Sequence, residues 1–203
     1  AYLDWTKPVF SPGRVNLSEV ICSLNDFLPD DAIIANGAGN YTAWIHRFYR
    51  YRTLGSQLAP TAGSMGYGLP AAVAAKLVQP HRPAIVFAGD GCFMMTGQEL
   101  ATAVQYQLSV VIVVVNNGMF GTIRMHQERR FPGRVIGTEL VNPDFCALAQ
   151  AYGAHAERVE ETAAFLPTLR RALDVSGPAL IELIVDPEAI TPARTLSDLT
   201  AGG

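Results

Sequence analysis

Apolar and polar positions along the chain follow two alternating patterns. Asn16, with Glu19 three residues later, reads as a helix start, and apolar side chains then keep helical spacing from Leu17 to Leu28, just before Pro29. Further on, short continuous apolar runs predict buried strands, and the stretches of helical spacing between them predict helices. Strands are expected at residues 32–35, 84–88, 110–115, 155–159 and 179–185, and helices at residues 66–78, 98–107, 143–152 and 162–175.

Continuous apolar strands that alternate with helices indicate a mostly parallel sheet covered on both faces, which is a doubly wound α/β fold. The longest apolar run, residues 110–115, is β-branched and far shorter than the roughly 20 residues needed to cross a bilayer, so it predicts a buried strand. Residues 1–186 are expected to form this domain. Residues 187–203 lack periodicity, which predicts a surface tail or an arm.

Composition and charge narrow the class of protein. With 203 residues, 49% of them hydrophobic, the chain can bury one sizeable core. A net charge of -3, without any basic cluster longer than a pair of arginines, argues against a nucleic-acid partner. Cys22, Cys92 and Cys146 are odd in number and lack C-x-x-C spacing, so they indicate neither a disulfide framework nor a zinc site. A cytoplasmic, reducing location fits best.

Two loops at predicted strand ends carry the candidate chemistry. Gly89-Asp90-Gly91-Cys92 follows one strand and leads into a helix. Glycines let the backbone approach a bulky anion, and amides at a helix start favour a phosphate group. Because a carboxylate beside a diphosphate would repel it, Asp90 implies a cation such as Mg²⁺ between them. The next strand ends in Asn117, whose amide oxygen could join the site, with the Met119 carbonyl close by.

Either loop alone is a common turn. Together they follow consecutive predicted strands that one helix connects, which is the crossover that would make them neighbours. In a doubly wound sheet, ligands bind outside the carboxyl ends of the strands. The sequence therefore predicts one magnesium and diphosphate site from the two loops.

Residues 89–117 resemble the thiamine diphosphate signature, in which G-D-G is followed by N-N after a helix and a strand. Residues 91–95 and 98–103 are similar to the acetolactate synthase, glyoxylate carboligase and benzoylformate decarboxylase group, and the resemblance covers nearly the whole chain. It implies that Asp90, Asn117 and the Met119 carbonyl hold Mg²⁺. The residues that it implies for the cofactor at these two loops are Gly89, Gly91, Cys92, Phe120 and Gly121.

Two further segments resemble the family. In residues 63–70, Met65 would wedge between the cofactor rings and the Gly63 carbonyl would meet the 4'-amino group, with Ser64 between them. That bent shape brings the amino group close to the thiazolium C2. A helix start with a core methionine is the alternative. The second segment, Ala38-Gly39-Asn40-Tyr41, aligns with the first diphosphate loop, although it also fits an ordinary helix entry.

The resemblance also implies what this chain lacks. The family needs a glutamate opposite the pyrimidine N1', and that residue lies in a pyrimidine-binding domain that no segment here resembles. We expect a piece of a longer protein, which starts at Ala1 and has no signal segment, and which alone binds thiamine diphosphate weakly and turns over no 2-keto acid. Its partner would be the pyrimidine-binding domain of a neighbouring subunit in a homodimer or homotetramer. FAD, used by some relatives, binds a different domain.

Residues 121–126 should face the substrate. Pyruvate decarboxylase-like enzymes have a glutamate at the position of Ile123, whereas acetohydroxyacid synthases have an aliphatic residue there but a tryptophan at the position of His126. Residues 121–124, which include Thr122, are similar to the glyoxylate carboligase pattern Gly-Leu-Ile-Arg. His126 would be a surface or core residue or would transfer protons.

Acetolactate synthase-like carboligation of 2-keto acids is the predicted reaction. A benzoylformate-type decarboxylase, a glyoxylate carboligase and a non-catalytic cofactor-binding module are the alternatives. Phosphoryl transfer is disfavoured because neither a phosphate-loop lysine nor a catalytic aspartate pair is present. Arg129, Arg130 and Arg134 could meet an acidic substrate, but a mobile loop around Pro132 and Gly133 is the preferred reading.

Overall fold

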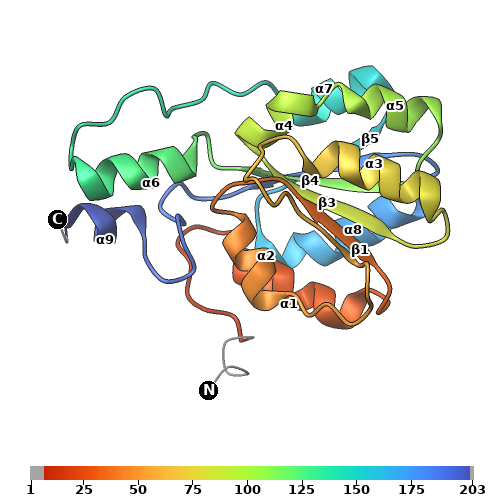
Figure 1. The fold of residues 1–203 in the computed structure, drawn as a ribbon, viewed down its shortest axis with the longest axis horizontal. Helices are drawn as coiled ribbons and strands as arrows, with labels where there is room; N and C mark the ends of the chain where they lie inside the picture. The colour runs from red at the N-terminus through yellow and green to blue at the C-terminus, as the bar shows by residue number, and fades with distance from the viewer. Residues whose placement is uncertain (1–6, 202–203) are drawn as a thin grey trace.

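A six-stranded, all-parallel sheet forms the centre of the computed structural model, which describes residues 7–201 (Figure 1). The strand order is β2-β1-β3-β4-β6-β5, and neighbouring strands pair in parallel throughout. The strands are β1 Ile33–Asn36, β2 Gln57–Leu58, β3 Ala84–Gly89, β4 Val110–Asn116, β5 His155–Val159 and β6 Ala179–Ile184. The predicted doubly wound α/β fold is confirmed.

Helices cover both faces of the sheet. Helices α1 (Leu17–Phe27), α2 (Thr42–Phe48) and α8 (Thr162–Asp174) lie on one face, and α3 (Gly68–Val78), α4 (Asp90–Thr96), α5 (Glu99–Gln105) and α7 (Phe145–Tyr152) lie on the other (Figure 1). Because both faces are covered, the central strands are apolar without alternation, and the six residues from Val110 to Val115 are all buried.

Local signals explain where several helices begin and end. The Asn16 side chain accepts a hydrogen bond from the Ser18 amide at 2.9 Å and so caps α1. Asp144 does the same for α7 through the Ala147 amide at 2.9 Å. Gly153 ends α7 with a φ of 91°, a left-handed conformation that suits glycine. Each of the five predicted strands also begins and ends within one residue of an observed strand.

Helix α6 (Gly121–Arg130) was not expected from the sequence. It is strongly polar, and within it only Glu128 is buried, so the apolar stripe that marks an ordinary amphipathic helix is missing. Arg129 and Arg130 form the last turn of this helix, so the prediction that they lie in a loop is wrong. Arg134 does lie in the irregular segment beyond it. The short elements α2 and β2 were also missed.

Residues 188–201 return to the molecule as an arm instead of trailing as a free tail. Helix α9 (Leu196–Ala201) lies alongside α6 (Figure 1). Leu196 and Leu199 are buried and form a small cluster with Ile190 and Met119, separate from the main core. No helix within residues 7–201 is both long and apolar enough to cross a membrane.

Candidate functional site

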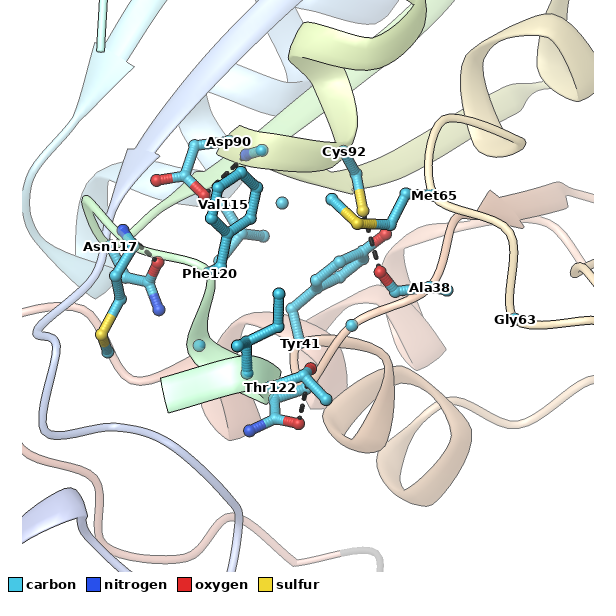
Figure 2. Close-up of a pocket in the computed structure, with 17 residues that line it drawn as sticks. Ala38, Tyr41, Gly63, Met65, Asp90, Cys92, Val115, Asn117, Phe120 and Thr122 are labelled. Atoms are coloured by element: carbon cyan, nitrogen blue, oxygen red, sulfur yellow. Dashed lines mark hydrogen bonds between the residues drawn. The ribbon is translucent and has the colours of Figure 1, made fainter. Parts of the chain in front are cut away.

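The reversal in strand order creates a crevice at the carboxyl edge of the sheet. The chain runs from β1 outward to β2 and then returns to the other side of β1 as β3, so the loops after β1 and β3 diverge. A cavity of about 230 Å³ lies at this edge (Figure 2). It is lined by Ala38, Gly39, Asn40, Tyr41, Gly63, Met65, Gly89, Asp90, Gly91, Cys92, Val115, Asn117, Met119, Phe120, Gly121, Thr122 and Ile123.

Asp90 lies at the first position of α4, where β3 ends, and its residue is only 2% exposed. One carboxylate oxygen, Oδ1, accepts a hydrogen bond from the Gly91 amide at 2.8 Å. The other, Oδ2, accepts from the Gly118 amide and from the Asn142 side chain, both at 2.8 Å. Burial raises the pKa of Asp90 above its ordinary value, and the hydrogen bonds from Asn142, Gly91 and Gly118 oppose that rise.

The donors around Asp90 are all neutral. Within residues 7–201, no lysine, arginine or histidine forms an ion pair with its carboxylate. A buried carboxylate without a cationic partner is costly, because desolvation of its charge is not compensated. A divalent cation bound in the cavity would supply the missing positive charge. The buried, uncompensated carboxylate of Asp90 therefore fits a hard metal ion that binds oxygen ligands.

The turn after β4 brings Asn117 to the cavity wall near Asp90 (Figure 2). Met119 lines the same cavity. Gly118 has a φ of 68°, which reverses the chain so that its amide points at Asp90. The Asn117 side-chain oxygen accepts from the Met119 amide at 3.3 Å, and the Met119 carbonyl accepts from the Gly121 amide at 2.9 Å. Since a carbonyl or amide oxygen has two lone pairs, both atoms keep acceptor capacity for a cation.

Glycines in these loops make room for aromatic rings. A Cβ placed on Gly37, Gly39 or Gly89 would lie 2.9 to 3.1 Å from atoms of Tyr41. The Tyr41 ring lies in the cavity wall between the loops after β1 and β3, and burial raises the pKa of its hydroxyl well above the ordinary range (Figure 2). A larger residue in these loops would therefore displace Tyr41.

Gly91 also makes room for an aromatic ring, because a Cβ on it would lie 2.5 Å from the Phe120 ring. Real Cβ contacts of that length do not occur, so a side chain at this position would push Phe120 out of its place in the cavity wall. Packing of these rings explains the glycines independently of any cofactor.

Polar contacts join the loop after β1 to the rest of the site. The Cys92 thiol donates to the Ala38 carbonyl at 2.8 Å (Figure 2). Thr122 donates its hydroxyl to the Asn40 side-chain oxygen at 2.9 Å, and the Asn40 amide donates to the Ile190 carbonyl at 3.0 Å. The Asn40 side chain thus connects three segments: the loop after β1, α6 and the segment around Ile190.

Most residues expected at the site line one cavity, but two do not. Gly63, with a φ of 66°, and the half-buried Met65 lie on its wall. Ser64, between them, is exposed and does not line it. Thr122 and Ile123 also lie on the wall, whereas His126 is exposed on α6 and does not.

Two residues at the site were missed in the sequence. Val115 lines the cavity from the end of β4, and apolar strand residues give no sign of which ones end at a ligand. Asn142 reaches Asp90 from a segment 52 residues further along the chain. Its neighbours Pro143 and Asp144 show only that a helix start follows. No local pattern could have placed its side chain at Asp90.

Comparison with known proteins agrees with this geometry. Residues 37–183 match the family model described as the thiamine pyrophosphate enzyme, C-terminal TPP binding domain. The chain is 35% identical over 197 residues to the acetolactate synthase large subunit of Lactococcus lactis subsp. lactis, a match that covers 90% of this chain and 34% of that protein.

Two other relatives carry similar names. The mitochondrial acetolactate synthase catalytic subunit of Aspergillus candidus is 36% identical over 154 residues, which are 75% of this chain and 22% of that protein. The probable acetolactate synthase large subunit of Methanocaldococcus jannaschii is 32% identical over 194 residues, which are 94% and 33% respectively. The chain thus spans between 22% and 34% of the length of these three relatives. With the family model matching most of its length, the chain belongs to the thiamine pyrophosphate enzymes, as a C-terminal TPP-binding domain of the acetolactate synthase group.

Proposed function

We propose that this chain is the diphosphate- and magnesium-binding domain of a thiamine diphosphate enzyme that acts on 2-keto acids and joins two of them in an acetolactate synthase-like carboligation. The observation that carries the proposal is the buried Asp90 carboxylate, which has only neutral donors around it and lies in the crevice where the strand order reverses. The names of the relatives support the reaction class.

In this proposal the chain's residues have separate tasks. Asp90, Asn117 and the Met119 carbonyl would hold Mg²⁺, and the backbone around Gly39, Gly91 and Cys92 would approach the diphosphate. Met65 would support the bent cofactor, together with the carbonyl of Gly63. Bound thiamine diphosphate would supply the carbanion-stabilising chemistry that loss of CO₂ from a 2-keto acid requires. The protein's part is to orient the cofactor and to keep water from the apolar side of the cavity.

The second half of the active site would come from a pyrimidine-binding domain on a neighbouring subunit of a cytoplasmic homodimer or homotetramer. Exposed apolar side chains support a partner. Ile123, on the cavity wall, is about half exposed, and so are Met94 and Met95 on α4, the helix that begins at Asp90. Large exposed apolar side chains are typical of an interface.

Ile123 also bears on the choice of reaction. Its side chain lies on the cavity wall and carries no group that could donate a proton. The proposal therefore favours addition of an acceptor carbonyl over simple protonation of the decarboxylated acyl group, which would release an aldehyde.

Replacing Asp90 by Asn tests the metal site. We expect the affinity for thiamine diphosphate measured with Mg²⁺ to fall at least about 100-fold, more than the 10- to 100-fold typical when a partner of a metal ligand is lost. Calorimetric titration of the chain, and in parallel of any longer protein that contains it, measures this. Asp174→Asn, at an exposed position at the end of α8, is the matched control. Equal affinities for the two variants would contradict the proposal.

A product assay tests the reaction. The longer protein is supplied with pyruvate, glyoxylate or benzoylformate, and the products are identified by mass spectrometry. An acetolactate-type product from pyruvate is expected. Aldehyde as the sole product would show that the enzyme is a decarboxylase and not a carboligase. Condensation of glyoxylate alone would identify a glyoxylate carboligase. The chain by itself is expected to form no product, and measurable turnover by it would overturn the need for a second domain.

A further inference from the structure

One side chain reaches the Asp90 carboxylate from a distant segment that no feature of the sequence connects with the site. The Asn142 amide nitrogen donates to Asp90 Oδ2 at 2.8 Å and to the Asn116 side-chain oxygen at 2.9 Å. An amide NH₂ group has two hydrogens, so these two bonds use both of them. Asn142 thereby connects the end of β3 with the end of β4.

The segment that carries Asn142 is itself hydrogen-bonded to the turn that follows β4. The Phe120 amide donates to the Thr138 carbonyl at 2.8 Å, and the Leu140 amide donates to the Gly118 carbonyl at 2.8 Å. Residues 138–140 therefore run antiparallel to residues 118–120, where Met119 and Glu139 form a bridge. Two residues later, the chain places Asn142 over Asp90.

On its other side, Asn116 belongs to a polar network that crosses the edge of the sheet. The Asn116 amide donates to Glu182 Oε1 on β6 at 2.8 Å, and Arg158 on β5 donates its Nε to Glu182 Oε2 at 2.7 Å. Arg158 also pairs with Asp144 at 3.2 Å. Asp144, Cys146 and Glu182 are close enough together to suggest a metal site, but the guanidinium of Arg158 already forms an ion pair with each of the two carboxylates. The group is better explained as an anchor for Asn116.

We propose that Asn142 is a positioning residue for the Asp90 carboxylate, which it holds at a fixed orientation for a divalent cation. Oδ2 accepts two hydrogen bonds and Oδ1 accepts one, so Oδ1 keeps the larger unused acceptor capacity. Asn142 prevents rotation of the carboxylate that would exchange the two oxygens. This inference rests on the proposed role of Asp90 in metal binding.

Replacing Asn142 by Ala removes both hydrogen bonds, and Mn²⁺ serves as the probe because its bound form has an electron paramagnetic resonance spectrum. With saturating thiamine diphosphate, we expect the Kd for Mn²⁺ to rise about 10- to 100-fold, as for loss of other groups that orient a metal ligand. We also expect the spectrum of bound Mn²⁺ to change in shape. A side chain that only stabilises the fold would not alter that spectrum.

Asn25→Ala is the matched control. Asn25 is also an asparagine that bridges two segments, donating to the Phe48 carbonyl and accepting from the Arg50 amide, both at 2.8 Å, but it does not line the cavity. It should lower Tm and leave the Kd and the spectrum of Mn²⁺ unchanged. If Asn142→Ala does not fold, Asn142→Ser replaces it; its single hydroxyl hydrogen can serve only one of the two acceptors, so an intermediate rise in Kd is expected.

The possible failures are distinguishable. If Asp90→Asn binds Mn²⁺ as well as the unchanged protein does, the proposed metal site is wrong and the role of Asn142 falls with it. If Asp90→Asn abolishes Mn²⁺ binding while Asn142→Ala leaves the Kd within about twofold and the spectrum unchanged, the metal site stands and only the role of Asn142 is overturned.

Discussion

At the scale of single residues, the site depends on a carboxylate that the fold makes unfavourable to ionise. Asp90 is buried, and burial raises its pKa, while hydrogen bonds from neutral donors only oppose the effect. In the metal-free protein the ionised form therefore costs stability. A cation and a proton should compete for this one side chain, which links metal binding to pH.

The stability of the metal-free protein should reflect that competition. The folded protein holds the Asp90 proton more tightly than the unfolded chain, whose pKa is near the ordinary 3.8. The resulting contribution to the free energy of unfolding is fully present below that value and is lost as pH rises through the higher, folded pKa. Saturating Mg²⁺ and thiamine diphosphate should offset the loss, because the cation favours the ionised form.

Thermal unfolding between about pH 4 and about pH 8, with and without Mg²⁺ and thiamine diphosphate, measures this effect. Asp90→Asn is the control, because it has no group that titrates at this position. The difference in Tm between the metal-free wild type and Asp90→Asn should change with pH in the direction given above. A difference that stays constant over the whole range would show that Asp90 is not the group responsible.

At the scale of elements, the positions of helix starts decide how closely the loops can approach one another. Gly68 is the first residue of α3 and packs against the end of β1. A Cβ at this position would lie 2.8 Å from Val86 Cγ2 and 3.0 Å from backbone atoms of Asn36 and Gly37. Because the loop after β1 continues from Gly37 into the cavity wall, α3 cannot move without a shift of the site.

Replacing Gly68 by Ala should therefore lower the free energy of unfolding by about 1–3 kcal/mol, the usual cost of overpacking. For a chain of this size that corresponds to a Tm decrease of about 2–4 °C per kcal/mol. Calorimetry measures it. Ala74→Ser, at an exposed position of the same helix, should change Tm little. An unchanged Tm for Gly68→Ala would mean that α3 can shift away from β1 at low cost.

At the scale of the whole molecule, the C-terminal arm supports a helix that the main core does not hold. Helix α6 is polar and contributes Thr122 and Ile123 to the cavity wall. The arm covers it through the small cluster around Leu196 and Leu199, and the Ile190 carbonyl is bonded to Asn40 in the loop after β1. The arm thus couples α6 to the loop after β1.

Replacing Leu196 by Ala should loosen α6 without unfolding the sheet. We expect a loss of about 1–2 kcal/mol, less than in a large core because the cluster is small. Amides of α6 should exchange hydrogen faster, while those of β4 should keep their protection, as in local unfolding. Hydrogen exchange followed by mass spectrometry measures both. Val78→Ala, which truncates an exposed side chain at the end of α3, is the control. Faster exchange in β4 as well would show that the arm belongs to the main cooperative unit.

The sequence by itself determined five of the six strands of the sheet and which of its polar side chains gather at the carboxyl edge. The strands β3 and β4 are almost continuously apolar, and β6 is apolar apart from Glu182, because both faces of these strands are covered. A local pattern was therefore enough to predict them. Asp90 and Asn117 were predictable as site residues because they follow consecutive strands. Parallel strands place their carboxyl ends at one edge of the sheet.

Only the tertiary structure decided how the site is held together. Asn142 meets Asp90 across 52 residues, Asn40 meets Ile190 across 150 residues, and Tyr41 lies against glycines of two loops. Helix α6 forms without an apolar stripe because an arm from the far end of the chain packs on it. Contacts of this kind depend on loop paths and side-chain packing, and the residues that make them carry no periodicity or spacing along the chain that would reveal their partners.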